Sequence, residues 1–114
     1  MYSSCCGNCG YKFALIDELK GAVRSFESDV AVATNLYGIM NCWDVSSITD
    51  MSNLFQAFGS FNEPIGCWDV SSVTDMNSMF QDALSFNQPL DSWDVSSVID
   101  MGSMFHGATS FNQP

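Results

Sequence analysis

The stretch CWDVSSVTDMNSMF, residues 67–80, decides how this chain of 114 residues is organised. A near-copy, CWDVSSITDMSNLF, begins at Cys42, and a third copy, SWDVSSVIDMGSMF, begins at Ser92. The tryptophans of the three copies are 25 residues apart, and the spacing holds without a gap. A period of this length with fixed apolar positions is typical of repeat proteins, in which each unit buries its apolar face against the next.

Each repeat divides into two parts that differ in the spacing of their apolar residues. In LDSWDV, residues 90–95, Trp93 and Val95 alternate with Asp94, which indicates a short strand with one inward face. From Val98 onward the apolar residues are separated by 3, 3, 1 and 3 positions, as on a helical face. The expected fold is therefore α/β: a leucine-rich-repeat-like, right-handed βα solenoid with three rungs of 25 residues.

A capping helix is predicted before the repeats. Within FALIDELKGAVRSFES, residues 13–28, the apolar side chains follow one helical stripe. They are Leu15, Ile16, Leu19, Ala22, Val23 and Phe26. Because a first rung exposes apolar surface, a helix here is suited to cover it. The chain then divides into a flexible cysteine-rich tail at residues 1–12, a capping helix and linker at 13–36, and the repeats at 37–114.

No such cover follows the third repeat. The sequence stops at Pro114, where a fourth rung would begin. Terminal repeats normally need a polar cap, so we expect a fragment of a longer array whose last rung is open to edge association.

The charge distribution argues against nucleic-acid binding. The net charge is -10, and all three cations lie within the first 24 residues. An acidic surface repels phosphate backbones, whereas cationic partners or divalent metals are compatible with it. No apolar run reaches the roughly 20 residues that span a bilayer, and no signal peptide is visible at the start of the chain.

The phrase FNQPLDSWDVSSVIDMGSMFHGATSFNQP, residues 86–114, resembles the BspA-like leucine-rich-repeat surface proteins. The resemblance covers residues 37–114 and implies an extracellular or cell-surface array used in adhesion or protein binding. The implied partner is a protein or a glycan. The resemblance supplies no catalytic residue and implies no cofactor.

The candidate binding surface is the concave face of the expected solenoid. Strand alternation directs one aspartate of each repeat outward, close to its equivalents in the neighbouring repeats. The predicted surface consists of Asp44, Asp69, Asp94, Ser46, Ser71, Ser96, Cys42, Cys67 and Ser92. Neighbouring carboxylates repel each other unless Ca²⁺ or a partner's Lys or Arg intervenes, and the alternative is that each accepts hydrogen bonds from local amides and Ser hydroxyls.

Two further polar columns have structural interpretations. The first, Asp50, Asp75 and Asp100, lies three residues after a Ser, which predicts capping of the helix in each repeat. The second, Asn62, Asn87 and Asn112, follows a Phe at a turn, and we expect a ladder from side-chain amides to backbone.

The five cysteines leave the redox state open. Cys42 and Cys67 hold the same position in neighbouring repeats, and parallel side chains favour two free thiols over a disulfide between them. Cys5, Cys6 and Cys9 are expected in a tail or in disulfides, since Cys6-x-x-Cys9 is only half of a zinc-binding pattern.

These observations predict a non-enzymatic interaction module. The one histidine, His106, replaces the glutamines of the other repeats, so a base beside a nucleophile is not indicated. Carboxylate pairs recur in every repeat, and duplication is typical of structural columns, not of a catalytic site. The alternative function is a Ca²⁺-stabilised structural module.

Overall fold

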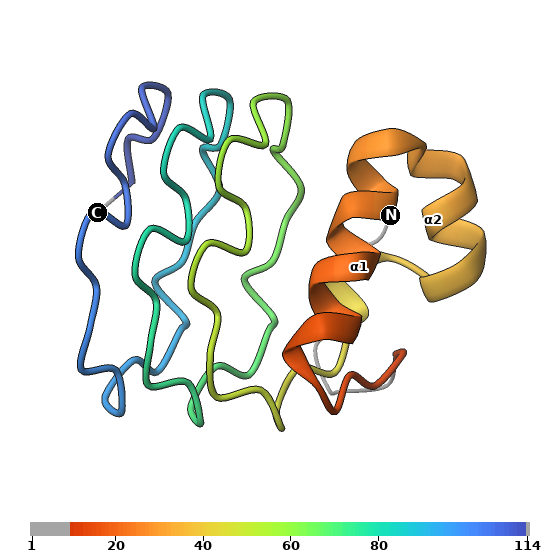
Figure 1. The fold of residues 1–114 in the computed structure, drawn as a ribbon, viewed down its shortest axis with the longest axis horizontal. Helices are drawn as coiled ribbons and strands as arrows, with labels where there is room; N and C mark the ends of the chain where they lie inside the picture. Colours follow the sequence, from red (N-terminus) through yellow and green to blue (C-terminus); the bar gives the residue numbers. More distant parts are fainter. Residues whose placement is uncertain (1–9, 114) are drawn as a thin grey trace.

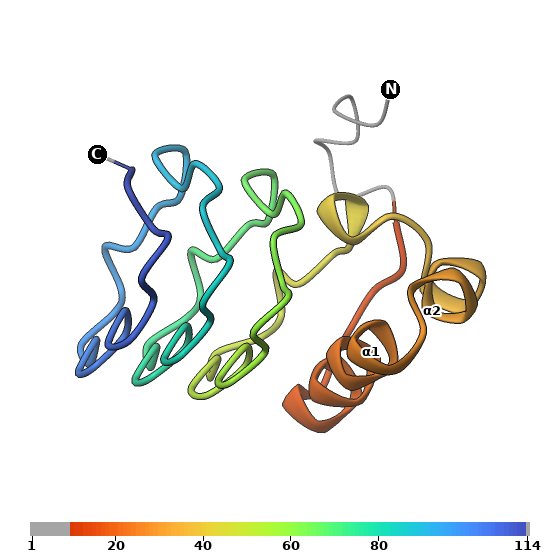
Figure 2. The same cartoon turned by 90° about the horizontal axis from the view of Figure 1, so that it is seen from above.

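The computed structural model describes residues 10–113, which form a helical cap followed by three similar coils (Figure 1). The cap comprises α1 (Ile16–Ser28) and α2 (Val30–Tyr37), and the short 3-10 helix η1 (Met40–Cys42) leads into the coils. We call residues 43–67 coil 1, residues 68–92 coil 2 and residues 93–113 coil 3. Figure 2 shows the coils side by side, with α1 against coil 1. The described residues measure 32 × 27 × 26 Å, a small compact globule.

The capping helix predicted from the apolar stripe forms as α1. Its buried side chains are Leu19, Ala22, Val23 and Phe26. Asp17 and Glu18 lie in the first turn, where negative charge is favourable, and the Leu15 amide donates to the Glu18 carboxylate over 3.3 Å. The Phe26 ring meets the Trp43 ring edge-on at 5.5 Å, so α1 covers the apolar end of coil 1.

The second helix, α2, lies where the sequence predicted only a linker. The Asp29 carboxylate accepts hydrogen bonds from the Ala31 and Val32 amides, which caps the start of the helix. Gly38, with a φ of 78°, ends it. The sequence signal was weak because VAVATNLY is rich in β-branched residues and only Ala33 is buried.

The helix predicted in each repeat does not form. In coil 1, residues 51–58 make successive turns, in which the Leu54, Gln56 and Phe58 amides donate to carbonyls three residues earlier. Asn53 and Ala57 have φ values of 62° and 61°, and left-handed residues at this spacing are incompatible with an α-helix. The apolar spacing arises equally well from such turns, which is why it was misleading.

The amides of these turns instead bond to the next coil. The amides of Met51, Asn53, Phe55 and Ala57 donate to the carbonyls of Asp75, Asn77, Met79 and Gln81, at 2.8 to 3.0 Å. Coil 2 repeats the pattern toward coil 3. In this ladder the N–H groups of each coil point toward the C-terminal side of the stack, and the carbonyls point toward the cap.

The strand predicted in each repeat is also absent. The Trp93 amide donates to the Leu90 carbonyl and the Val98 amide to the Val95 carbonyl, so turns flank a very short extended stretch. Within residues 10–113 the only β-pairings are three isolated parallel bridges: Lys12 with Asp44, Asp50 with Asp75, and Asp75 with Asp100. The expectation of a leucine-rich-repeat βα solenoid is therefore wrong, because neither of its two elements is present in the described coils.

The core consists of columns of equivalent side chains. The rings of Trp43 and Trp68 stack at 6.2 Å, and Phe55 stacks on Phe80 at 5.4 Å. The indole N–H of Trp68 donates to the Met40 carbonyl over 2.7 Å, and that of Trp93 donates to the Ile65 carbonyl over 3.0 Å. A tryptophan at this position therefore fills the core and also bonds one coil to the preceding one.

The N-terminal tail predicted at residues 1–12 lies mostly outside the described residues. At the end of this tail, the backbone carbonyl of Tyr11 accepts a hydrogen bond from the Asp44 amide. Lys12 forms the isolated parallel β-bridge with Asp44. None of the described helices is long and apolar enough to span a membrane.

Candidate functional site

The first aspartate column forms local turns at the surface of the coils. In coil 1, Oδ1 of Asp44 accepts from the Ser46 amide at 3.0 Å and from the Ser46 hydroxyl at 2.6 Å. Asp69 has the same two bonds with Ser71, and Oδ1 of Asp94 accepts from the Ser96 amide at 3.0 Å. Local hydrogen bonding, one of the two alternatives raised by the sequence, therefore accounts for one oxygen of each carboxylate.

These hydrogen bonds stabilise the ionised carboxylates. The Ser46 hydroxyl, and then its amide and Lys12, lower the pKa of Asp44, although burial opposes them. Hydrogen bonds from Ser96 similarly lower the pKa of Asp94. Lys12 Nζ lies 3.7 Å from Asp44 Oδ2. Hydrogen bonds from Ser46 and Ser96 therefore favour the ionised forms of Asp44 and Asp94.

The second aspartate column caps turns and not helices. Oδ1 of Asp50, Asp75 and Asp100 accepts from the amide two residues later, at 2.8 to 2.9 Å. Burial raises the pKa of Asp50, but the Ser52 hydrogen bonds outweigh it, so the pKa is lowered overall. The amide of Gly102, followed by Asn77, lowers the pKa of Asp100. The prediction that these aspartates cap helices is wrong, because no helix follows them in the described coils.

The asparagine ladder predicted from the sequence is confirmed. Oδ1 of Asn62 accepts from the Asn87 amide at 2.9 Å, and Oδ1 of Asn87 accepts from the Asn112 amide at 3.0 Å. The side chains of Gln88 and Gln113 reinforce the two steps. Each asparagine thus bonds its own coil to the next.

The cysteines of the predicted surface are not free thiols. Cys42 and Cys67 are both disulfide-bonded, which corrects the expectation from their parallel placement. Cys42 is buried, Cys67 is half-buried and Ser92, at the third equivalent position, is exposed. Cys5, Cys6 and Cys9 lie outside the described residues.

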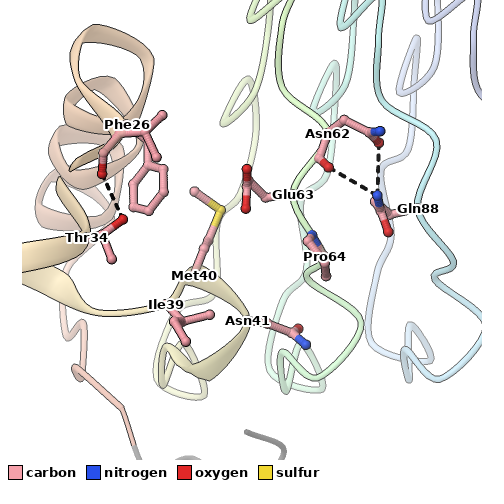
Figure 3. Close-up of a pocket in the computed structure, with 10 residues that line it drawn as sticks. Phe26, Thr34, Ile39, Met40, Asn41, Asn62, Glu63, Pro64 and Gln88 are labelled. Carbon is pink, nitrogen blue, oxygen red and sulfur yellow. Dashed lines mark hydrogen bonds between the residues drawn. The ribbon is translucent and has the colours of Figure 1, made fainter. Parts of the chain in front are cut away.

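A hollow of the described surface lies between the cap and the first two coils (Figure 3). It has a volume of about 420 Å³. Its lining residues are Phe26, Val30, Thr34, Ile39, Met40, Asn41, Asn62, Glu63, Pro64 and Gln88. We call this hollow the cap groove. None of these residues was predicted to bind a partner, because the groove depends on how α2 and η1 pack beside the coils.

The cap groove combines apolar walls with a small set of polar groups. Val30 and Ile39 remain 54% and 42% exposed, although both are aliphatic. Gln88 Nε2 donates to the carbonyl and the side-chain oxygen of Asn62, as the dashed lines in Figure 3 show. The exposed Glu63 carboxylate has no ion-pair partner among residues 10–113. An apolar hollow with one unpaired carboxylate suits a ligand that is partly apolar and positively charged.

The geometry provides no evident donor set for a metal ion. Among residues 10–113, no three His, Cys, Asp or Glu side chains lie close enough together to hold one. His106 is exposed on coil 3, far along the chain from the cap groove.

Comparison with known proteins identifies a family but no function. No curated protein and no solved structure matches the chain. Residues 21–114 match the family model described as a Mycoplasma protein of unknown function, DUF285. The resemblance to BspA-like leucine-rich-repeat proteins is therefore wrong, since the matching model is that of a different family. Because the match covers α1 from Gly21, α2 and all three coils, the chain belongs to the DUF285 family.

Proposed function

We propose that this chain is a non-enzymatic protein-binding module, and that the cap groove receives a partner segment carrying an aliphatic or aromatic side chain next to Lys or Arg. The supporting observation is that one hollow combines exposed Val30 and Ile39 with the Glu63 carboxylate, which forms no ion pair with any residue in 10–113. The net charge of -10 adds a long-range attraction for such a partner.

We further propose that the module works outside the cell or at its surface. The disulfide bonds of Cys42 and Cys67 support this location, because structural disulfides persist in oxidising compartments and are rare in reducing ones.

Selection of random displayed peptides on the immobilised, oxidised protein tests the groove. Enriched peptides should pair an apolar residue with Lys or Arg, and Glu63→Lys should weaken their binding about tenfold, as expected for a partly buried ion pair. Asp91→Lys is the matched control, because it makes the same charge change on an exposed residue outside the groove. Equal binding by the two variants would show that only net charge matters and would reject the site.

The Ca²⁺-stabilised module, the alternative raised by the sequence, has less support. Each column aspartate already uses one oxygen locally, and the described residues offer no cluster of three acidic or other metal-binding side chains. We expect the melting temperature to be the same in Ca²⁺ and in EDTA. A rise with Ca²⁺ that Asp69→Asn abolishes would favour the alternative over our proposal.

A further inference from the structure

A smaller hollow adjoins the cap groove where α1 meets coil 1. It has a volume of about 90 Å³, and we call it the side hollow. The residues that line both the side hollow and the cap groove are Phe26, Val30, Asn62 and Glu63. The two hollows are therefore contiguous. The side hollow adds Glu27 of α1, so a second carboxylate lies close to that of Glu63.

Glu63 differs in type from the residues at the same position of the later coils, which are Gln88 and Gln113. Each glutamine donates from Nε2 to an asparagine of the preceding coil, as Gln88 does to Asn62 on the wall of the cap groove (Figure 3). Coil 1 follows the cap and not another coil, and it carries at this position a carboxylate, which only accepts hydrogen bonds. No group within residues 10–113 donates to Glu63. The position that binds the previous coil elsewhere is thus an unused acceptor here.

Glu27 is a second acceptor without a partner in the same hollow. It is exposed and forms no ion pair with any residue in 10–113. Arg24, one turn earlier in α1, lines another small hollow together with Glu27, yet no ion pair joins the two side chains. The walls beside Glu27 and Glu63 include the buried Phe26 and Phe61 rings. Apolar walls reduce the screening by water, so a cation that reaches both carboxylates is held more strongly than on an open surface.

The chemistry of the side hollow favours arginine over other cations. A guanidinium presents five N–H donors in a planar fork, so it can donate to Glu27, to Glu63 and to the Ser60 hydroxyl that also lines the hollow. An ammonium group is compact and more strongly hydrated, and it satisfies fewer of these acceptors at once. The apolar stem of an arginine can lie along Phe26 and Val30. A metal ion is less suited, because the described residues offer no group of three metal-binding side chains.

We propose that the side hollow is a subsite for an arginine side chain of the partner segment. The guanidinium lies between Glu27 and Glu63, and the apolar side chain next to it in the partner occupies the cap groove. This inference rests on the proposed function and narrows it, because it makes the basic residue Arg and not Lys. Glu27 is then the residue that determines specificity, since it lines the side hollow but not the cap groove. The net charge of -10 cannot supply the preference, because it attracts Arg and Lys alike.

The test compares probes that differ only in their last residue: the amides of N-acetyl-leucyl-arginine, N-acetyl-leucyl-lysine and N-acetyl-leucyl-citrulline. Each is titrated into the isotope-labelled, oxidised full chain, and the shifts of its NMR signals give the dissociation constants. We expect the arginine probe to bind about fivefold more tightly than the lysine probe, the gain from an additional charge-assisted hydrogen bond. The citrulline probe has nearly the same shape without the charge and should bind most weakly.

Substitution of Glu27 assigns the preference to the side hollow. Glu27→Gln should reduce the affinity for the arginine probe to about that for the lysine probe, and should leave the lysine probe nearly unchanged. Asp17→Asn is the matched control, because it removes the same charge from an exposed residue in the first turn of the same helix. It should preserve the preference for arginine.

The outcomes separate this subsite from the proposed function. Equal binding of the arginine and lysine probes by the wild type, or an equal loss of preference in the two variants, would overturn the subsite and leave the cap groove as a binding site. If no probe shifts the signals of Val30, Ile39 and Glu63, the proposed function is rejected together with the subsite.

Discussion

At the scale of single residues, the coils depend on backbone conformations that most amino acids disfavour. Two positions per coil have positive φ: Asn53 and Ala57, Ser78 and Asp82, Ser103 and Gly107. Only Gly adopts this region without a steric cost, and Asn and Asp tolerate it better than Ala does. The residue type at these positions therefore affects stability through the backbone conformation, in addition to any contact that its side chain makes.

Ala57→Gly should stabilise the protein by about 1 kcal/mol, because glycine relieves the left-handed strain at an exposed position. Gly107→Ala should destabilise it by at least about 1 kcal/mol. Alanine is strained at the positive φ of residue 107, and its Cβ would collide with the Asp82 side chain. Urea unfolding measures both changes. Ala31→Gly, in the exposed face of α2, is the control and should lower stability by up to about 1 kcal/mol. If Ala57→Gly and Ala31→Gly both stabilised the protein, the gain at residue 57 could not be assigned to its positive φ.

Stability should also depend on acid pH. The pKa values of Asp44, Asp50, Asp94 and Asp100 are lowered in the folded chain, mainly by hydrogen bonds to nearby Ser, Gly and Asn groups. A lowered pKa adds stability above the unfolded value of about 3.9, and this stability is lost as the pH falls through the folded values. We expect the free energy of unfolding to decrease below about pH 4.

Ser46→Ala should shift acid unfolding to higher pH, because it removes the largest contribution that lowers the pKa of Asp44. Ser47→Ala is the control, since Ser47 is exposed and does not bond to this carboxylate. Circular dichroism during acid titration distinguishes them. Coincident titration curves for the two variants would contradict the assignment.

At the scale of elements, the described coils are held by ladders between equivalent residues and not by helices or strands. The 25-residue period, the capping helix and the asparagine ladder were all predictable, because each depends on short or exactly repeated spacing. The turns of residues 51–58 were not, because their amides bond to residues 24 positions later, a choice that local spacing does not reveal. Positive φ at Ala57 also leaves no signal in its residue type.

Asn87→Ala tests the ladder directly. It removes the oxygen that accepts from both the Asn112 amide and the Gln113 side chain, and should lower stability by about 1 kcal/mol. Asn112→Ala is matched in type and exposure, yet no donor within residues 10–113 reaches its side-chain oxygen, so it should be nearly neutral. Chemical unfolding of the pair provides the comparison. A cost that is the same at both positions would assign it to local turn preference and not to the ladder.

In the candidate site too, contacts between residues close in sequence were predictable, and contacts between distant segments were not. The serine partners of Asp44 and Asp69 follow two residues later, so the sequence could anticipate their hydrogen bonds. The cap groove joins Phe26 of α1 to Gln88 of coil 2, and its existence depends on an unpredicted helix. Exposed aliphatic residues in VAVATNLY were the available signal, since only Ala33 of that helix is buried.

At the scale of the whole molecule, the cap and the coils share one hydrophobic core. The Trp43 ring of coil 1 lies 4.9 Å from the Phe13 ring, which precedes α1. It also lies 5.5 Å from the Phe26 ring of α1. Phe58, buried in coil 1, holds the position of Ala83 in coil 2, and its ring lies near α1 side chains such as Val23. The larger side chain fills the wider space between a helix and a coil. The cap and coil 1 should therefore unfold together.

Reduction of the disulfides should lower the stability of the oxidised protein by about 2–4 kcal/mol. The bonds of Cys42 and Cys67 constrain the chain where the cap meets the first two coils. Thermal melting with and without a reductant measures the change. In a protein carrying both Cys42→Ser and Cys67→Ser, the reductant should have much less effect. Identical melting of the oxidised and reduced wild type would show that the disulfides contribute little, and would weaken the argument for an extracellular location.

The register between coils has a consequence for how such genes change. Equivalent backbone groups bond across an offset of 24 or 25 residues, and the Trp, Phe and Asn columns keep the same offset. An in-frame loss or duplication of one coding unit therefore rejoins the chain at a point where the backbone ladder and the Trp, Phe and Asn columns already have counterparts. Slippage during DNA replication can thus lengthen or shorten such an array in whole units, whereas the cap, which has no counterpart among the coils, is exempt from this kind of variation.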